Sequence, residues 1–301
     1  MGERETTMTG LEQILVGTDL STGAGWALVR GAVVAGQHGA RLHLMNAMPQ
    51  LSLNGVAESY RPYRIEVEDQ TRWADATRAQ LHALAEAASG RFGIAVQEHV
   101  TVGNAVSEIG SFVRTLPADL LLVGAHGEGF LRDLLLGSTA FALLQRAVCP
   151  LLVAKVESAE RYDNVLVGID FTNSCRPALE AALLIAPGAH VAALHAVRIP
   201  YEGIINVVSG ESNTLDTWRR QAVDAARDQL DEFIDGSNAA RRVERIAVYG
   251  HAAHALVSCA KAARADLIVV GKSAASSADA LVGGVTKHVV EAADCDVLVV
   301  P

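Results

Sequence analysis

GAHGEGFLRDLLLGST, the stretch from Gly124 to Thr139, directly follows a short apolar run, Asp119 to Val123 (DLLLV). Gly124, Gly127 and Gly137 divide this stretch, and an amphipathic helix pattern begins after the last of them. Glycine lets backbone N–H groups approach a ligand that a Cβ atom would keep away, and a helix N-terminus offers N–H donors to an anion. The stretch therefore predicts a buried strand that ends in an anion-binding turn, or else a turn whose glycines only shape the loop.

The composition predicts two ordered domains, because 301 residues are half hydrophobic and one fifth charged. The net charge is −9 without any basic block, which argues against nucleic acid as a partner. No apolar run reaches the roughly 18 residues of a membrane span, and the polar start of the chain lacks a secretory signal. The four cysteines lie far apart and form no CxxC pair. A reduced cytoplasmic protein without membrane contact is therefore expected.

Strand-like runs alternate with amphipathic helix patterns, and the whole order occurs twice. The runs in the first half cover residues 12–16, 41–47, 94–102, 119–123 and 151–155. In the second half ADLIVVG, at 265–271, repeats ADLLLVG, at 118–124. Gly271 and Gly284 each follow their counterparts Gly124 and Gly137 by 147 positions. We therefore expect two domains of one kind, residues 10–155 and 161–301, joined by a short linker.

Strands that are apolar on both faces and alternate with helices predict an α/β fold with parallel sheets covered on both faces. Ligands bind such open sheets outside the carboxyl ends of the strands, where the strand order reverses. Asp19 ends the first strand and Gly124 ends the fourth, so neighbouring strands would place both beside Ala47 in one pocket. A carboxylate for sugar hydroxyls or an amine, a small residue beside a ring, and N–H groups for an anion together describe a nucleotide site.

The chain resembles a tandem of two universal stress protein domains over nearly all of both halves. The resemblance rests on Gly124, Gly127 and Gly137-Ser138 at the spacing of the family's ATP motif, with Asp19 and Ala47 at nucleotide-contact positions. It implies two open five-stranded sheets of Rossmann-like type, with strand order 3-2-1-4-5. It also implies that the two domains pair through their fifth strands, and it leaves a homodimer open.

The ligand that the resemblance implies is ATP or a related adenine nucleotide, with or without Mg²⁺. The protein would act in the stress response as a sensor or adaptor rather than as an enzyme. The residues expected to contact the nucleotide are Gly17, Thr18, Asp19, Ala47, Gly124, His126, Gly127, Arg132, Gly137, Ser138 and Thr139.

Both halves depart from the family pattern. Glu128 and Asp133 stand where ATP-binding members often carry basic residues, which weakens triphosphate binding unless Mg²⁺ or Arg132 compensates. In the second half Ala274 replaces the second glycine and Val285 replaces the Ser or Thr, so we expect weak ATP binding there or none. The second pocket would hold another ligand or serve in pairing, and its candidate residues are Asp170, Ala196, Gly271, Lys272, Gly284 and Thr286.

Several alternatives stay open. Asp19 can cap the following helix instead of contacting a ligand, and His126 can shape the loop instead of binding phosphate or acting as a base. His251 and His254 share a helix face but show no third metal ligand. A nucleotide hydrolase is the second functional hypothesis, although the sequence holds no complete P-loop and no convincing base–nucleophile pair. A scaffold without a ligand is the third.

Overall fold

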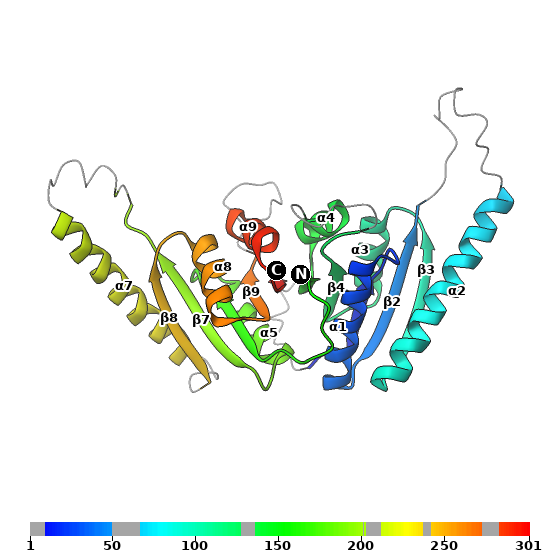
Figure 1. Cartoon of the computed structure of the whole chain (residues 1–301), viewed down its shortest axis with the longest axis horizontal. Helices are drawn as coiled ribbons and strands as arrows, with labels where there is room; N and C mark the ends of the chain where they lie inside the picture. Colours follow the sequence, from blue (N-terminus) through cyan, green and yellow to red (C-terminus); the bar gives the residue numbers. More distant parts are fainter. Residues whose placement is uncertain are drawn as a thin grey trace, which may run out of the picture. The chain divides into compact units, whose positions relative to one another are not determined.

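The computed structural model describes residues 10–49, 67–127, 136–200, 202, 212–236, 242–272 and 283–301. The chain divides into two compact units, Gly10–Glu160 and Arg161–Pro301, named domain 1 and domain 2 below. Figure 1 labels the helices and several of the strands of each unit. Within the ranges given above, no helix has the length and apolar character needed to cross a membrane.

Domain 1 alternates parallel strands with helices (Figure 1). Its elements are β1 (Gln13–Gly17), α1 (Thr22–His38), β2 (Arg41–Met48), α2 (Val67–Phe92), β3 (Val96–Val102), α3 (Ala105–Thr115), β4 (Leu120–Gly124), α4 (Ser138–Arg146) and β5 (Leu151–Ala154). The strand order is β3-β2-β1-β4-β5, with every pair parallel. The first and fourth strands are neighbours, as the nucleotide-site prediction requires, with Ile14 opposite Leu120 and Val16 opposite Leu122.

Domain 2 repeats this arrangement. Its elements are β6 (Asn164–Gly168), α5 (Cys175–Ile185), β7 (His190–Val197), α7 (Ser212–Asp235), β8 (Val243–Tyr249), α8 (Ala252–Ala263), β9 (Leu267–Gly271), α9 (Gly284–Ala292) and β10 (Asp296–Val300). The order β8-β7-β6-β9-β10 is again 3-2-1-4-5, and its strand pairs are parallel. The predicted α/β fold is confirmed. The expectation of two separate sheets is not confirmed, and pairing through the fifth strands stays a prediction.

An aspartate ties the first and fourth strands together in each domain. Asp119 Oδ2 accepts hydrogen bonds from the backbone N–H groups of Glu12, at 2.7 Å, and Gln13, at 2.8 Å. Asp266 accepts in the same way from Asp163, at 2.7 Å, and from Asn164. A carboxylate that accepts from backbone N–H groups at a strand start fixes the register of the two strands. The repeated Ala-Asp sequence before the fourth strand therefore has a structural function in both halves.

Side chains alternate along β2 between two covered faces, because successive residues of a strand point to opposite sides. Leu42 faces α1, where its Cδ1 atom lies close to Gly31. His43 faces α3, where its ring packs near Phe112. Met45 and Ala47 lie two and four residues further on and so share the face of α3. This face leads along β2 to the carboxyl ends of the strands.

Candidate functional site

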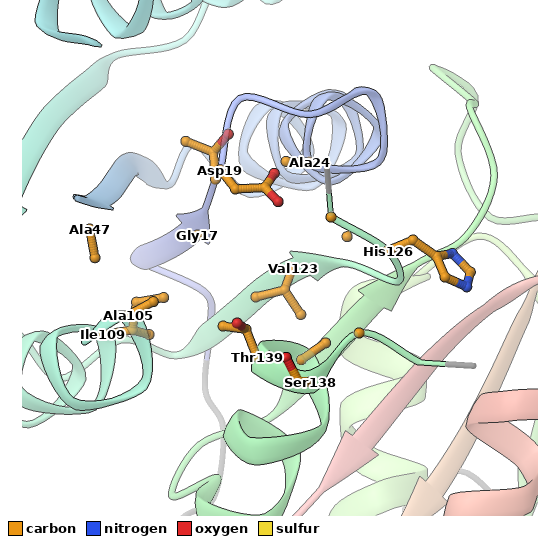
Figure 2. Close-up of a pocket in the computed structure, with 15 residues that line it drawn as sticks. Gly17, Asp19, Ala24, Ala47, Ala105, Ile109, Val123, His126, Ser138 and Thr139 are labelled. Atoms are coloured by element: carbon orange, nitrogen blue, oxygen red, sulfur yellow. The ribbon is translucent and has the colours of Figure 1, made fainter. Parts of the chain in front are cut away.

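A cavity of about 280 Å³ opens at the carboxyl ends of β1, β2 and β4 in domain 1 (Figure 2). Helices α3 and α4, and Ala24 at the start of α1, supply its remaining walls. The predicted contact residues that line it are Gly17, Thr18, Asp19, Ala47, Gly124, His126, Gly127, Gly137, Ser138 and Thr139. Arg132, together with the acidic residues Glu128 and Asp133, lies outside the described residues. The structure therefore brings together every predicted contact residue of domain 1 that it describes.

The start of α4 forms the polar end of this cavity. No side chain caps the helix at Gly137, whose own N–H group donates to the carbonyl of Ala125 at 2.8 Å. The first hydrogen bond within the helix runs from Phe141 to the carbonyl of Gly137. The N–H groups of the first turn, at Ser138 and Thr139, thus have no partner inside the helix and are available to an anion. Figure 2 shows both side chains at the helix start, facing the strand ends.

The opposite end of the cavity is apolar and narrow. Ala47 from β2 and Val123 from β4 line it together with Ala105 and Ile109 from α3 (Figure 2). Asn104 fixes the start of α3, because its Oδ1 accepts from two N–H groups of the first turn. Ala105 and Ile109 were not predicted as site residues. They lie four residues apart on an amphipathic helix, and this spacing indicates a buried face but not a ligand site.

The glycines of the turn are required by the packing of the protein itself. A Cβ atom at Gly124 would lie 2.6 Å from the carbonyl carbon of Gly23 and 2.8 Å from the nitrogen of Ala24, both in the backbone at the start of α1. A Cβ atom at Gly127 would collide with Oδ2 of Asp19. The alternative stated for the sequence, that these glycines shape the loop, therefore holds for both Gly124 and Gly127. It is compatible with ligand binding, because the same contacts hold the loop against the cavity.

Asp19 forms a turn that occurs again in domain 2. Its Oδ1 accepts from the N–H group of Ser21 at 3.0 Å, and the intervening Leu20 has a left-handed φ of 67°. Asp170 accepts from Thr172 at the same distance, around Phe171 with a φ of 60°. The match between the two aspartates thus has a structural cause, and it does not by itself indicate a ligand. Contact between the exposed carboxylate of Asp19 and a ligand stays a prediction.

His126 lines the cavity through its backbone, whereas its ring points away from the cavity in Figure 2. The carbonyl oxygen of His126 lies against Gly23, where a Cβ atom would come within 2.6 Å. A base or a phosphate contact must direct its ring nitrogens toward the reacting or bound group. The orientation therefore favours the loop-shaping role over the other two.

In domain 2 the start of α5, the counterpart of α1, is occupied by a network of the chain's own hydrogen bonds. Asp170 Oδ1 accepts from the hydroxyl group of Thr172 at 2.5 Å and from the thiol group of Cys175 at 2.9 Å. Burial, aided by the Asp170 carboxylate, raises the pKa of the Cys175 thiol to about 11. Thr172 also exchanges a hydrogen bond with Ser174, whose Oγ occupies the space beside Gly271. These polar groups satisfy one another, whereas α9, the counterpart of α4, begins without a side-chain cap.

The other candidates of domain 2 are only partly brought together. Thr286 is buried and donates to the carbonyl of Gly271 at 3.3 Å. Burial lowers the pKa of Lys272, whose backbone N–H donates to Val300. Gly284 has open space where a Cβ atom would stand, and Ala196 lies near the end of β7. Asp170, Gly271 and Thr286 are thus linked through Ser174 and Thr172, while no contact joins Ala196 and Gly284 to them in the described part of domain 2.

Comparisons with known proteins identify the family of both halves. The sequence model of the universal stress protein family matches residues 10–155 and 161–301. A universal stress protein of Mycolicibacterium smegmatis is 28% identical over 298 residues, which cover 95% of this chain and 96% of the relative.

Solved structures show the same fold. The universal stress protein of Archaeoglobus fulgidus superposes with a TM-score of 0.67 at 18% identity, covering 96% of this chain and 97% of its own. A universal stress protein solved in complex with cAMP aligns with 50% of this chain and 100% of its own, at 23% identity and a TM-score of 0.36. The bound cAMP belongs to that universal stress protein.

Proposed function

The chain belongs to the universal stress protein family, with one family domain in each half, and from that premise we propose that domain 1 binds ATP or a related adenine nucleotide. The protein then acts as a stress-linked sensor or adaptor rather than as an enzyme. One observation carries the proposal: a single cavity joins a small apolar end, at Ala47 and Ile109, to the free N–H groups at the start of α4. Its volume of about 280 Å³ is near the lower end of small-molecule sites, which begin at roughly 300 Å³.

The two ends of the cavity suit different parts of the nucleotide. The base fits beside Ala47, Ala105 and Ile109, since these side chains are small or apolar. The phosphates fit at the start of α4, because N–H donors and the helix dipole both favour negative charge. The Asp19 carboxylate suits ribose hydroxyls better than phosphate, so Mg²⁺ would accompany the phosphates to reduce repulsion.

Calorimetry and thermal unfolding with ATP and Mg²⁺ test the proposal. We expect a dissociation constant between the low micromolar and millimolar range, and a rise in melting temperature with ligand concentration. Ala47→Leu fills the apolar end of the cavity and should weaken binding at least tenfold. Ala196→Leu makes the same change at the equivalent position of domain 2 and should leave binding unaltered. If millimolar ATP gives neither heat nor a shift in melting temperature with the wild-type protein, the nucleotide proposal fails.

Two further features belong to the same proposal. We expect phosphate release from ATP at the background rate of the buffer, and release that depends on Asp19 would instead support a hydrolase. We also propose that the domains pair through their fifth strands, β5 and β10. Slow amide exchange along both strands is then expected, because a paired strand is protected whereas a free edge is not.

A further inference from the structure

Domain 1 contains a pair of histidines that the proposed function does not use. His43 is buried, with 2% of its surface exposed. Its Nδ1 atom lies 3.0 Å from Nε2 of His99, and its Nε2 atom lies 2.9 Å from Oε1 of Gln13. An amide oxygen only accepts, so this network assigns the proton of His43 to Nε2. His43 Nδ1 then accepts from the Nε2–H group of His99, and both rings are neutral.

The pair shares two walls with the nucleotide cavity. The ring of Phe112, on α3, lies 4.5 Å from that of His99 and 5.8 Å from that of His43, measured between centroids. Ile109 and Ala105, one and two turns earlier on α3, line the cavity. On β2 the cavity residue Ala47 stands on the same face as His43, with only Met45 between them on that face. A movement of α3 at Phe112 would therefore also change the cavity wall.

Domain 2 has apolar residues where domain 1 has this pair. Ala192 is the equivalent of His43, because it pairs with Leu166 as His43 pairs with Leu15. Ile246 is the equivalent of His99, because it pairs with Leu194 as His99 pairs with Met45. The position of Phe112 on α3 corresponds to Cys259 on α8. The same fold can therefore pack this region without histidines. The histidine pair occurs in domain 1, which also has the cavity.

We propose that the His43–His99 pair is a proton-sensitive element in the wall of the domain 1 cavity, which loosens α3 and releases the nucleotide on acidification. This inference rests on the proposed nucleotide binding. The first proton adds to Nδ1 of His99, because its Nε2–H group is engaged with His43. The second proton must add to Nδ1 of His43, which breaks the hydrogen bond between the rings and sets two cations against each other.

The groups around the pair oppose its protonation. Burial is the largest effect on His43, and the His99 ring and the Arg41 guanidinium add to it, so the pKa of His43 falls from 6.5 to about 4. Burial also lowers the pKa of His99. The titratable and charged groups of the packed elements are Glu12 just before β1, Arg41 on β2, Glu98 and His99 on β3, Glu108 and Arg114 on α3, and Asp119 before β4. Glu98 precedes His99 in the strand and so points to the opposite face, where it is hydrogen-bonded to His82.

The nearby carboxylates are directed elsewhere. Asp119 accepts from the backbone of Glu12 and Gln13, and Glu108 lies against Gly103. Arg114 donates to the hydroxyl group of Ser111. Within the described part of domain 1, no hydrogen bond joins a carboxylate to the ring of His43 or His99. A proton on the pair is therefore uncompensated unless the rings separate or reach water.

Hydrogen exchange tests this element without any nucleotide. We expect the α3 amides, 105–115, to lose at least tenfold protection between pH 7.5 and pH 4.5, after correction for intrinsic exchange, while the α8 amides, 252–263, do not. The double variant His43→Ala and His99→Ile installs the residues of domain 2 and removes both titrating rings, so the loss should largely disappear. His99→Gln keeps an N–H donor for His43 and keeps the buried His43 ring, so it should remove only the part of the loss that comes from His99. His190→Gln removes an exposed histidine and should behave as the wild type.

Nucleotide affinity supplies the second measurement, on the full-length protein with ATP and Mg²⁺. The dissociation constant should rise at least tenfold more between pH 7.5 and pH 4.5 in the wild type than in the double variant His43→Ala and His99→Ile. Circular dichroism at each pH checks that both proteins remain folded. If the wild type and the double variant respond equally to acid in exchange and in affinity, the inference is overturned and the proposed function is not. If the wild type does not bind nucleotide at pH 7.5, the proposed function is overturned. The release of nucleotide is then overturned as well, even if acid loosens α3.

Discussion

Domain 1 and domain 2 have the same scaffold and differ at the ends of their strands. Both have the strand order 3-2-1-4-5, the aspartate that ties the first strand to the fourth, and the left-handed turn after the first strand. In domain 1 the following helix, α1, begins beside a cavity, whereas at the start of α5 in domain 2 Thr172, Ser174 and Cys175 are joined with Asp170 by hydrogen bonds. The apolar strands and tight turns are therefore common to both domains, and the side chains at the helix starts are what differs.

The comparison extends below the cavity, to the third helix of each domain. Phe112 on α3 packs on two imidazoles, whereas domain 2 has Cys259 at the Phe112 position and Ala192 and Ile246 at the histidine positions. Two regions with one architecture thus differ in their response to protons as well as in their access to ligands. The following four experiments test these differences.

Acid should produce the largest difference between the domains. The folded-state pKa of His43 is about 4 and its unfolded value is about 6.5, so the unfolded state binds the proton first. Stability of domain 1 is therefore complete above pH 6.5 and falls as the pH decreases toward 4. At pH 4.5 the expected loss from His43 is about 2–3 kcal/mol. Native-state hydrogen exchange of the β2 and β7 amides measures each domain separately, and an equal loss in both contradicts the comparison.

Gly124→Ala should be the next largest effect. Its Cβ atom would meet backbone atoms of Gly23 and Ala24, which cannot turn aside, so we expect domain 1 to lose about 2 kcal/mol. Gly271→Ala, at the equivalent position, meets mainly the Ser174 side chain and should cost less. Gly25→Ala has open space and serves as the control. Urea denaturation measures the three values, and equal losses at 124 and 271 would remove this distinction.

Replacement of the two turn aspartates should have a smaller effect, and it separates stability from binding. Asp19→Ala removes the acceptor for Ser21 and should cost about 1 kcal/mol, whereas Asp19→Asn keeps that acceptor and should cost little. Asp170→Ala should cost more than Asp19→Ala, because Asp170 also accepts from Thr172 and Cys175 side chains. Denaturation gives the stabilities and ATP calorimetry the binding. Weaker binding by Asp19→Asn at unchanged stability would support a ligand contact, and unchanged binding would leave Asp19 as a turn residue.

Thiol labelling should give the smallest effect. Burial raises the pKa of Cys149 to about 12 and that of Cys175 to about 11, so both stay protonated at pH 8. The pKa of Cys259 is also raised, but this residue is less buried. Since the thiolate is the nucleophile, Cys259 should react with iodoacetamide before the other two. Mass spectrometry of labelled peptides reports the order, and early labelling of Cys175 would show that the filled helix start of domain 2 opens.

Much of the fold and of the cavity follows from the sequence. The apolar runs predicted the strands to within a few residues, because strands buried on both faces have a near-continuous hydrophobic pattern. The repeat at 147 positions predicted two similar domains. The neighbouring placement of β1 and β4 came from the family resemblance, and once it is given Asp19 and Gly124 must meet at one edge of the sheet.

The remaining features depend on register and on close approach, which sequence patterns do not contain. His43 and His99 are 56 residues apart, and only the pairing of β2 with β3 brings their rings together. The contact of Gly124 with the α1 backbone depends on distances of less than 3 Å. The match of Asp19 with Asp170 in the sequence favoured a ligand contact, whereas the structure shows that both aspartates form a backbone turn, and ligand contact by Asp19 stays a prediction.

The contact at Gly124 also limits how the crevice can adapt. Backbone lies directly on backbone there, so that side has no side-chain rotamers to change. Across the crevice the Ile109 side chain of α3 approaches β1, and its Cδ1 atom lies 3.0 Å from the Cβ position of Gly17. Larger or smaller ligands must therefore be accommodated by α3, and variation at Ile109 is the simplest route to a different ligand size.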